Sequence, residues 1–584
     1  MYRYMAHKAA PFVTEKDKER FWHSTSHILA DAVKRLWPDV KLGIGPAIAD
    51  GFYYDFDKKE PFTAEDIVKI ESAMKKIIKE GKLFKAIKMP RKEAEKFLAK
   101  EPYKLELLRD ISDKEVSFAQ HGQFIDLCNS PLVEQAGQIK AFKLLNMAAA
   151  YWRGDSKRKV LQRIYGISFP NQEMLADFLE RREEAEKRDH RKLGPQLGLF
   201  FFHETAPGMP YWMPKGQIIL NVLIDFWRKE HAKRGYHEIS TPILNKKELW
   251  ETSGHWEHFK DDMFIAKVGD EIYGLKAMNC PNAMIAFGSK TRSYKDLPLR
   301  FSDTDVLHRC EASGAMTGLL RARSFRQDDS HNYVTEDQIE AEYNEIFKIT
   351  ELFYGIFKIP YKYRLSTRPE KFMGDRLIWD KAEAILRKIL DKKIGKGKYI
   401  VGATEGAFYG PKVDILMTDA MGREWQTGTI QLDFLQPKRF NLKYTDKDNK
   451  EKTPICIHRV IYGSLERFIG ILIENYAGAF PTWLAPVQVK LLTFTDRNQK
   501  YAEKIEKQLR EAGLRVETDY SSNTVEYKVR QAEMEKVPAI LVCGDKEEKT
   551  NTIALRKRGI AKVQFGIKTD SFIRDIKKEI ETKA

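Results

Sequence analysis

The sequence contains few cysteines and no long apolar run. Its 584 residues include five cysteines, an odd number that is widely spaced along the chain. Such a set is not the framework of a disulfide-stabilised secreted domain. No apolar stretch approaches the roughly 18 residues that a membrane-spanning helix requires. We therefore expect reduced cysteines and no membrane partner.

The first twenty residues, MYRYMAHKAAPFVTEKDKER, also lack the continuous apolar core of a secretory signal, so we expect a cytoplasmic protein. No internal repeat or low-complexity tract is evident. The hydrophobic share of 42% is ordinary for globular domains with real cores. At typical domain sizes, this length predicts roughly three or four domains.

Basic residues outnumber acidic ones. The chain has 100 lysines and arginines against 84 aspartates and glutamates, a formal net charge of +16. A surplus of this sign favours a polyanionic partner, because cationic side chains release counterions condensed on phosphates. It is equally compatible with a lysine-rich surface that binds nothing, and composition alone does not separate the two.

Periodicity predicts a multidomain protein of mixed helices and strands. Apolar residues at helical spacing predict a helix over 16–37, followed by strands over 39–56 and a helix over 64–80 opened by a capping-box spacing at 63–66. A charged helix ending at Gly194-Pro195 is expected to connect two parts of the chain. The last 99 residues alternate strand and helix, which is typical of an α/β sheet. We expect domains over 1–170, 196–485 and 486–584, with a linker helix over 171–195.

Three residues of metal-ligand type lie in the centre of the chain. They are Cys280, His331 and His458, separated by 51 and 127 residues. One Cys and two His suit zinc, and three protein ligands leave a position open for a substrate. By spacing alone the pattern is weak, because a single buried Cys or His usually belongs to an ordinary core.

Further motifs occur along the chain, some of them next to these three residues. They include Gly51–Phe56, Tyr151–Asp155, Gly254-His255-Trp256, Met278–Pro281, His308–Glu311, Arg321–Asp329, Tyr409–Lys412, Gly463–Phe468 and Pro481–Pro486. In this order, from about His23 to the C-terminus, they resemble the threonyl-tRNA synthetases, a family of class II aminoacyl-tRNA synthetases.

The resemblance implies a fold and an activity. The expected fold has an editing-like α+β domain, a class II catalytic core built on an antiparallel sheet, and an α/β anticodon-binding domain. The expected enzyme activates L-threonine with Mg²⁺-ATP to threonyl-adenylate and transfers it to the 3′ end of tRNA(Thr). It would hold one Zn²⁺ per subunit and form a homodimer through motif 1, a helix expected at Ile218–Arg234.

The resemblance also assigns an ATP site. Arg309 would bind the α-phosphate and the substrate carboxylate, Arg467 the γ-phosphate, and Arg321 would add a third cation, because phosphoryl chemistry depends on positioning and electrostatics. Phe325 would stack on adenine with Glu311 near its amino group, and Gln426 would be a further contact. The alternative is that these arginines form structural ion pairs.

In the expected amino-acid pocket, zinc takes both the amino group and the hydroxyl of threonine, whereas valine cannot supply the hydroxyl. Asp329 would accept the hydroxyl hydrogen bond. His255 is a plausible polar partner for the transfer step. The chain departs from the family at Ala277 and Ala312, where proline is usual, and at Arg326, where a small polar residue is common. The other expected pocket residues are Met278, Gln327, Tyr409, Gln431 and Ser464.

The N-terminal region resembles a proofreading domain. Serine keeps both zinc-binding groups and differs from threonine by one methyl, which gives about 1–3 kcal/mol of discrimination, so a second hydrolytic site is expected. The family signature is His-x3-His followed by Cys-x3-His. His23, His27 and Cys128 match it, but Leu132 replaces the last histidine and has no donor, acceptor or metal-binding atom.

Whether the domain still removes serine is left open by the sequence. Lys104 and Asp126 are present as possible contacts to the tRNA end or to a water molecule, and the alternative is an intact fold with degraded chemistry. Some relatives carry one more small N-terminal domain, and this chain is expected to begin after it.

The C-terminal region resembles the class II anticodon-binding domain. Arg530, Glu547 and Arg556 match positions that read anticodon bases, as side chains can on unstacked loops. The Arg-Asn pair of the family is replaced near Ser521–Asn523. Two other functions stay open: a paralogue that passes an activated amino acid to something other than tRNA, and an RNA-binding regulator with an inactive site.

Overall fold

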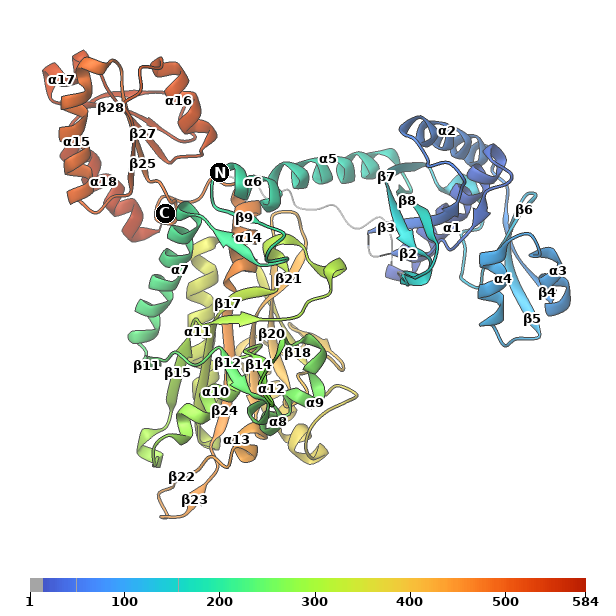
Figure 1. The fold of residues 1–584 in the computed structure, drawn as a ribbon, viewed down its shortest axis with the longest axis horizontal. Coiled ribbons are helices and arrows are strands. Elements are labelled where there is room, and N and C mark those ends of the chain that lie inside the picture. The colour runs from blue at the N-terminus through green and yellow to red at the C-terminus, as the bar shows by residue number, and fades with distance from the viewer. Residues whose placement is uncertain (1–13, 49, 156, 584) are drawn as a thin grey trace. The chain divides into compact units, whose positions relative to one another are not determined.

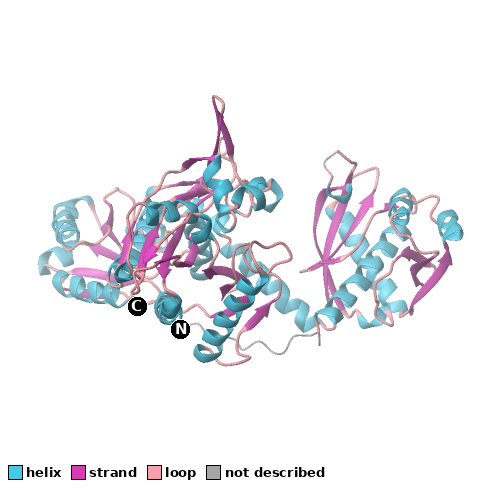
Figure 2. Cartoon of the chain, turned by 90° about the horizontal axis from the view of Figure 1, so that it is seen from below, coloured by secondary structure: helices cyan, strands magenta, loops and turns pink. Residues whose placement is uncertain are grey.

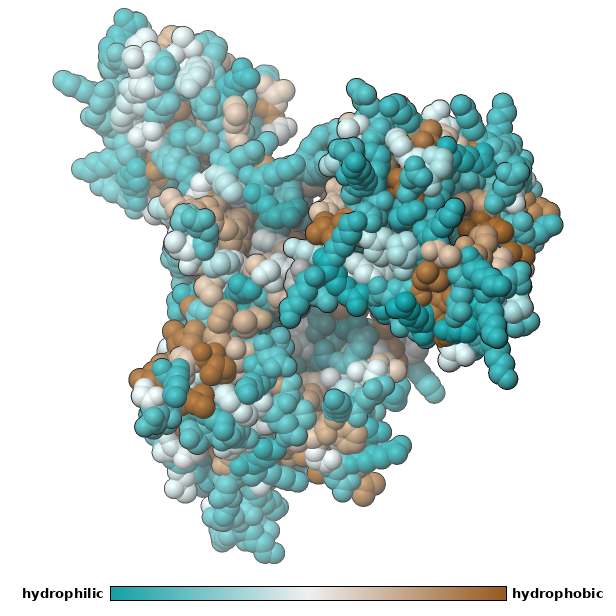
Figure 3. Space-filling model, turned by 45° about the vertical axis from the view of Figure 1, so that its right-hand side comes forward, coloured by the Kyte–Doolittle hydropathy of each residue, from teal (hydrophilic) through white to brown (hydrophobic). Residues whose placement is uncertain are grey.

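The computed structural model describes residues 14–48, 50–155 and 157–583, and it divides into two compact units, one ending at Glu184 and the other beginning at Ala185 (Figure 1). Both units contain helices and strands (Figure 2). Within the described residues, no helix is long and apolar enough to cross a membrane. The face seen in Figure 3 is mostly hydrophilic.

The first unit is built around a long helix on an antiparallel sheet. Helix α1 (Glu15–Leu36) is capped by Thr14, and it packs against α2 (Ala64–Glu80) and β3. The predicted capping box at Thr63 and Asp66 is present in both halves. The sheet has the order β1-β3-β8-β7, with β2 beside β3. Its strands are β1 (Lys41–Leu42), β2 (Ala47–Ile48), β3 (Gly51–Asp57), β7 (Ala141–Tyr151) and β8 (Val160–Phe169).

A smaller sheet completes this unit. Its order is β4-β5-β6, and the last strand ends one residue before Cys128. The elements are β4 (Phe84–Pro90), α3 (Arg91–Phe97), α4 (Pro102–Arg109), β5 (Glu115–His121) and β6 (Phe124–Leu127). The helices and strands expected over 16–37, 39–56 and 64–80 are confirmed.

The prediction of one connecting helix ending at Gly194-Pro195 is wrong. Helix α5 (Gln172–Arg188) ends, and α6 (His190–Gln196) begins after a single residue. That residue is Asp189, whose side chain accepts a hydrogen bond from the backbone N–H of Arg191. An N-cap aspartate starts a new helix at low cost, and Pro195 is tolerated in the short α6 that follows.

The second unit contains a large, mainly antiparallel sheet. Its order is β11-β15-β17-β24-β21-β20-β18-β19, with β16 also pairing with β17. The β11–β15 and β18–β19 pairs at the ends of the sheet are parallel. The antiparallel class II core that we predicted is confirmed. The strands are β11 (Tyr236–Glu238), β15 (Leu299–Asp303), β16 (Val306–His308), β17 (Ser324–Val334), β18 (Tyr361–Ser366), β19 (Ile400–Gly402), β20 (Lys412–Thr418), β21 (Glu424–Asp433) and β24 (Ile455–Ser464).

Strand alternation gives this sheet one apolar and one polar face. Ile430, Leu432 and Ile457 are fully buried in the main core, which includes residues of helices α7, α11, α12 and α14. The intervening residues Gln431 and His458 point to the opposite face, because successive side chains alternate along a strand. The helices are α7 (Pro214–Ala232), where a helix was expected over Ile218–Arg234, α11 (Ile339–Phe357), α12 (Arg376–Lys393) and α14 (Leu465–Tyr476).

Smaller elements surround the polar face and the edges of the core. They are the hairpin β9 (Phe200–Phe202) and β10 (Pro210–Trp212), the sheet of β12 (Leu244–Lys246), β14 (Glu271–Leu275) and β13 (Ile265–Val268), the helices α8 (Lys247–Ser253), α9 (His255–His258), α10 (Cys280–Gly288) and α13 (Gln436–Arg439), and the hairpin β22 (Tyr444–Thr445) and β23 (Glu451–Lys452).

The last hundred residues form the expected α/β sheet, in the order β26-β25-β27-β28-β29. Strand β25 runs parallel to both of its neighbours, and β28 is antiparallel to β27. The prediction missed the short elements α17 and β29. The elements are β25 (Val489–Thr493), α15 (Gln499–Glu511), β26 (Val516–Asp519), α16 (Val525–Met534), β27 (Ala539–Cys543), α17 (Asp545–Thr550), β28 (Ile553–Lys557), β29 (Gln564–Ile567) and α18 (Thr569–Thr582).

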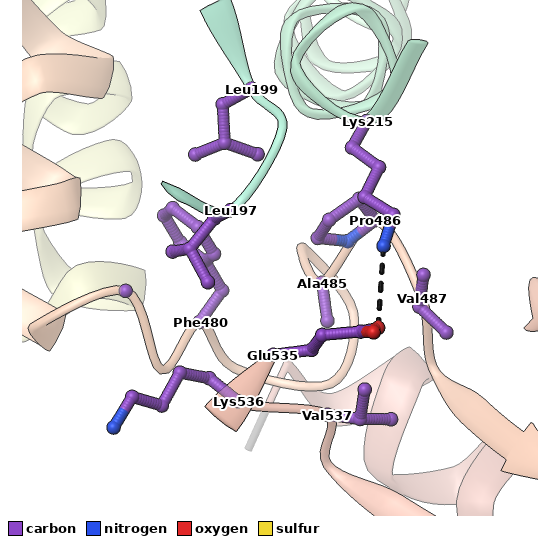
Figure 4. A pocket seen from close by; sticks show the side chains of 11 residues that line it. Leu197, Leu199, Lys215, Phe480, Ala485, Pro486, Val487, Glu535, Lys536 and Val537 are labelled. Atoms are coloured by element: carbon purple, nitrogen blue, oxygen red, sulfur yellow. Dashed lines mark hydrogen bonds and ion pairs between the residues drawn. The ribbon is translucent and has the colours of Figure 1, made fainter. Parts of the chain in front are cut away.

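A small pocket lies where the core meets this C-terminal sheet (Figure 4). The Lys215 side chain, in the first turn of α7, extends to Glu535, with 3.4 Å between Nζ and Oε2. The same lysine contacts Glu517 on β26 at 3.2 Å. The pocket is lined mainly by apolar side chains, and these include Leu197, Leu199, Phe480, Ala485, Val487 and Val537. The pocket therefore belongs to the junction and contains none of the expected ATP, threonine or metal residues.

Gly463, near the end of β24, has a backbone that only glycine adopts comfortably. Its φ is +76°, and a Cβ there would overlap the carbonyl oxygen of Thr427. Gly559 has φ of +79°, but no atom lies within 4 Å of the place that a Cβ would take, so it is a matched control. We predict that Gly559→Ala costs only the left-handed conformation, about 1 kcal/mol, and that Gly463→Ala costs at least about 2 kcal/mol more. Denaturant unfolding of both variants measures this difference, and equal losses would contradict it.

Candidate active site

The register of three strands places the predicted zinc and threonine residues side by side. Gln431 on β21 lies opposite His458 on β24, which lies opposite His331 on β17. Residues directly opposed in antiparallel strands project from the same face. The rings of His331 and His458 are 4.9 Å apart between centroids. Two residues further along the strands, the same face carries Asp329.

Cys280 completes the cluster from the first residue of α10. Cys280, His331 and His458 each offer one donor atom, and these atoms lie within 4.8 Å of one another. The Nδ1 atoms of both histidines are buried without a hydrogen-bond partner. His458 Nε2 lies 2.8 Å from Asp433 Oδ2, which leaves Nδ1 as its free donor atom. Two unpartnered imidazole nitrogens beside a thiol fit a metal ion whose ligand is oriented by a carboxylate.

The charge state of Cys280 depends on such an ion. Burial, with the nearby carboxylates of Asp329 and Asp433, raises the pKa of the Cys280 thiol well above its usual value. A bound Zn²⁺ reverses this preference, because a coordinating thiol is deprotonated. The Cys280 thiol therefore stays neutral by itself and would bind as a thiolate only beside a cation.

The expected threonine-pocket residues gather around this cluster. Asn279 Nδ2 donates to Asp329 Oδ2 at 3.1 Å. The ring of Tyr409 lies 5.1 Å from that of His458, and its hydroxyl donates to Gln431 Oε1. Gln327 lies opposite Ser464 in the register of β17 and β24, before a bulge that separates it from Asp329.

His255 is part of the same buried environment rather than a free polar group. Its Nδ1 is 2.8 Å from Ser253 Oγ, and its Nε2 is 2.9 Å from Met278 Sδ and 3.7 Å from Cys280 Sγ. Burial, with smaller contributions from His458 and Arg309, lowers the pKa of His255 to about 3. The imidazole is therefore neutral at physiological pH.

Three predicted arginines lie close enough for Arg309 and Arg321 to affect the charge of Arg467. The Arg309 guanidinium lies over the Phe325 ring at 5.1 Å from its centroid. Arg467 donates from Nε to Leu320 O at 2.8 Å and from Nη1 to Gln426 O at 3.1 Å. Burial and the positive charges of Arg309 and Arg321 lower the pKa of Arg467. A cation whose pKa is lowered by neighbouring cations lies where an anion is favoured.

Several expected residues have partners that their proposed roles did not anticipate. Glu311 accepts from Arg321 Nε at 2.8 Å, and Arg321 is about half exposed. The Gln426 side chain donates to Asp414 Oδ1 at 2.7 Å. The contact of Gln426 with Arg467 is made by its main-chain carbonyl oxygen. Arg326, which departs from the family pattern, donates from Nη1 to the main-chain carbonyl oxygen of Thr304 at 3.1 Å. Its guanidinium is therefore satisfied by the backbone.

Sequence reasoning missed two residues of this site, Asn279 and Asp433. Asn279 stands inside the Met-Asn-Cys-Pro motif, which was a usable signal. Asp433 follows Gln431 by two residues on β21, and this spacing puts both on one face of a strand. No motif marked Asp433 beforehand.

A second cluster occurs in the first unit. His23 Nε2 lies 3.2 Å from Cys128 Sγ and 3.2 Å from His27 Nε2. Asp126 Oδ1 is 2.6 Å from Lys104 Nζ, and its Oδ2 is 3.1 Å from His27 Nδ1. All five expected editing residues are thus brought together. A sixth, Tyr54, was missed, and its hydroxyl donates to Asp126 Oδ2 at 2.5 Å.

The charges in this second cluster are coupled. Burial opposes a charge on His27, but Asp126 and Cys128 prevail and raise its pKa to about 9. Burial likewise opposes a thiolate, but His23 and His27 lower the pKa of Cys128 to about 6. The half-buried Leu132 lies one residue before Val133, whose N–H donates to Ser24 Oγ at 2.9 Å. The residue after Leu132 is thus hydrogen-bonded to the residue after His23 on α1, and the family motif has histidine at position 132.

The expected anticodon residues lie on two helices and one strand of the C-terminal domain. Arg556 on β28 is 3.2 Å from Glu533 on α16, the helix that also carries Arg530. Glu547 lies in α17 and is largely buried. The replaced segment at Ser521–Asn523 lies just before α16.

Three family models match separate parts of the chain. Residues 116–165 match the threonyl and alanyl tRNA synthetase second additional domain. Residues 264–476 match the tRNA synthetase class II core domain (G, H, P, S and T), and residues 484–579 match an anticodon binding domain. A crystal structure described as the RNA binding domain of threonyl-tRNA synthetase from Cryptosporidium parvum Iowa II superposes with a TM-score of 0.65 at 38% identity, covering 67% of this chain and 98% of that one.

Two relatives that match nearly the whole chain are named threonine–tRNA ligase. The threonine–tRNA ligase of Caldanaerobacter subterraneus subsp. tengcongensis is 50% identical over 576 residues, which cover 98% of this chain and 89% of that protein. The threonine–tRNA ligase of Acetivibrio thermocellus is 50% identical over 550 residues, covering 94% of this chain and 86% of that protein. Together with the antiparallel core and the clustered site residues, this similarity shows that the chain belongs to the threonyl-tRNA synthetase family of class II aminoacyl-tRNA synthetases and is a threonine–tRNA ligase.

Proposed function

We propose that this ligase recognises L-threonine through Zn²⁺ held by Cys280, His331 and His458. The observation that carries the proposal is that Cys280, His331 and His458 bring three metal-ligand atoms together. Both histidines have a buried Nδ1 atom without a hydrogen-bond partner. Asp433 holds the His458 ring in place from its other nitrogen. A closed structural site has four protein ligands, whereas three leave room for a substrate.

The chain's own residues supply the rest of the pocket. When bound, Zn²⁺ supplies Lewis-acid positions for the amino and hydroxyl groups of threonine. Asp329, held by Asn279, accepts the hydroxyl hydrogen bond. Met278, Gln327, Tyr409, Gln431 and Ser464 enclose the amino acid, and His255, neutral and buried, positions Met278 and the Cys280 side of the pocket.

Activation takes place beside this pocket. The threonine carboxylate attacks the α-phosphorus of Mg²⁺-ATP, and pyrophosphate leaves. Arg309 binds the α-phosphate and the carboxylate, Arg467 the γ-phosphate, and Arg321 the remaining phosphate charge once it releases Glu311. Their mutual repulsion, visible in the lowered pKa of Arg467, is relieved by a polyphosphate. Adenine stacks on Phe325, with Glu311 and the Gln426 carbonyl at the edge of the site.

The partners follow from the other parts of the chain. The C-terminal domain binds the anticodon of tRNA(Thr) through Arg530, Glu547 and Arg556. Helix α7 and the strand after it belong to motif 1, through which we expect a homodimer in the cytoplasm. The first unit retains His23, His27, Lys104, Asp126 and Cys128, and it hydrolyses seryl-tRNA(Thr) at a rate reduced by Leu132.

Charging assays test the proposal as a whole. The purified protein is incubated with tRNA(Thr), Mg²⁺-ATP and labelled threonine or serine, and the label retained on tRNA is measured. Retention of threonine alone supports discrimination together with proofreading. Retention of both amino acids shows the ligase without effective proofreading, and stimulation of ATP consumption by valine would contradict zinc-assisted recognition.

Removing a ligand tests the zinc site. We predict that Cys280→Ser lowers bound zinc from one to near zero per chain and raises KM for threonine at least about tenfold. Asp433→Asn leaves all three ligands in place but loosens His458, and loss of a partner that orients a metal ligand costs about 10- to 100-fold in metal affinity. Metal analysis after dialysis against a graded chelator measures both variants.

A buried cysteine elsewhere in the chain provides the control. Cys543 on β27 lies in the core of the C-terminal sheet, so Cys543→Ser is expected to change neither zinc content nor KM for threonine. Full zinc retention by Cys280→Ser would refute the assignment of this ligand.

Restoring the motif histidine tests the proofreading site. We predict that Leu132→His increases the rate of hydrolysis of preformed seryl-tRNA(Thr) by about 10²-fold or more, the usual contribution of general acid–base catalysis. Leu132→Ala is the matched control, because it removes the leucine without adding a proton acceptor. Equal rates for the two variants would show that the histidine position does not limit hydrolysis. Threonine charging should be the same in both variants.

A further inference from the structure

His190 connects three elements of the second unit although no expected role includes it. The imidazole is buried in the first turn of α6, with 2% of the side chain exposed. Its Nδ1 lies 2.6 Å from Glu474 Oε1 on α14. Its Nε2 accepts a hydrogen bond from the backbone N–H of Leu319 at 3.0 Å. Leu319 belongs to a short 3-10 turn, Gly318–Leu320, that ends one residue before Arg321.

These two partners fix the tautomer of the ring. A nitrogen that accepts from a backbone N–H carries no proton, so Nε2 is unprotonated and Nδ1 donates to the Glu474 carboxylate. Glu474 is held in turn by Arg423 through its other oxygen. Burial opposes its charge, but His190 and Arg423 prevail and lower the pKa of Glu474. The ring is therefore a fixed acceptor directed at the 3-10 turn.

The turn passes this constraint to Arg467. Leu320, the residue after Leu319, accepts at its carbonyl oxygen the hydrogen bond from Arg467 Nε at 2.8 Å. Arg467 and Glu474 both belong to α14, seven residues or about two turns apart, so they lie on one face of the helix. Hydrogen bonds thus link Glu474 to His190, His190 to the 3-10 turn, and the turn back to Arg467 on the same helix.

The backbone is shaped to allow this closed arrangement. Gly470 lies between Arg467 and Glu474 on α14, where a Cβ would approach within 3.1 Å of Leu320 Cδ2 and 3.2 Å of Leu319 Cβ. Gly318 has φ of +60°, and a Cβ there would overlap His190 Nε2. Two glycines thus let the helix and the imidazole reach the turn closely.

We propose that His190 is a positioning residue for ATP binding, which holds the 3-10 turn so that Arg467 and Arg321 face the triphosphate. The inference rests on the proposed assignment of these two arginines to ATP. His190 contacts no reacting group. It acts by fixing the position of the Leu320 carbonyl, which binds the Arg467 guanidinium, and the position of the backbone that leads into Arg321.

Two amide substitutions separate the functions of the two ring nitrogens. Glutamine can place an oxygen near the Nε2 position and keep the Leu319 hydrogen bond, whereas asparagine reaches only the Nδ1 position. We expect His190→Asn to raise KM for ATP about three- to tenfold in ATP–pyrophosphate exchange, the effect of one lost hydrogen bond. His190→Gln should stay within about twofold of the parent protein. KM for threonine and zinc content should be unchanged in both.

A control and a second variant keep the outcome interpretable. His231 is a comparably buried histidine whose Nδ1 bonds to the carbonyl oxygen of Trp227, so His231→Asn should lower the melting temperature without selectively raising KM for ATP. If both His190 variants fail to fold, Glu474→Gln tests the proposal instead. It keeps the size of the side chain but removes the carboxylate that holds the proton of His190 on Nδ1. A selective rise in KM for ATP supports the proposal.

Equal KM values for ATP in His190→Asn and His190→Gln, parallel increases for ATP and threonine, or an unchanged KM for ATP in Glu474→Gln would overturn the proposal. Arg467→Ala tests the underlying assignment separately. If Arg467→Ala leaves KM for ATP unchanged, the ATP assignment is wrong. If it raises that KM while His190→Asn does not, only the positioning role is wrong.

Discussion

The pairing of β17, β24 and β21 is the constraint on which the rest of the active site depends. Antiparallel register brings His331, His458 and Gln431 into one row although they are far apart in sequence. A slip of one residue in any of these strands would turn its polar residues into the apolar core and its isoleucines toward the substrate. The buried face beneath, which includes Ile430, Leu432 and Ile457, therefore maintains the register that the chemistry needs.

The second feature of the site is that polar and charged side chains are buried without the ligands that would pair with them. The unpartnered nitrogens of two histidines and the clustered arginines are unfavourable in a dry site, and the Cys280 thiol cannot ionise there without a cation nearby. Taking such groups out of water costs free energy that the core must offset. In the proposed function, Zn²⁺ binds the free histidine nitrogens and the Cys280 thiolate, and the ATP triphosphate pairs with the arginines. Binding therefore supplies the partners that these groups lack in the folded chain. The same reasoning explains why hydrogen bonds to main-chain carbonyls hold Arg309 and Arg467 in place.

Much of this fold could be predicted from the sequence where local signals agree with tertiary packing. The apolar spacing over 16–37, the capping box at Thr63 and the alternation after residue 486 each led to the observed elements. The break at Asp189 was missed because a run of charged residues looks helical while one aspartate caps a new helix. Among the site residues, motifs identified those that resemble family positions. Tyr54 stood inside the Gly51–Phe56 motif without an assigned role, and no motif marked Asp433 or His190, whose importance lies in contacts across more than one element.

The leucine at position 132 has a consequence at the scale of the cell. Its neighbour Val133 is hydrogen-bonded to Ser24 on α1, and the leucine side chain itself has no proton acceptor. To the extent that hydrolysis is slowed there, discrimination rests on the first site, and one methyl group is worth about 10- to 200-fold. The frequency of serine at threonine codons then rises in proportion to the ratio of free serine to free threonine. Translational accuracy would thereby become tied to amino-acid supply, so the same enzyme would make proteomes of different fidelity in different growth media.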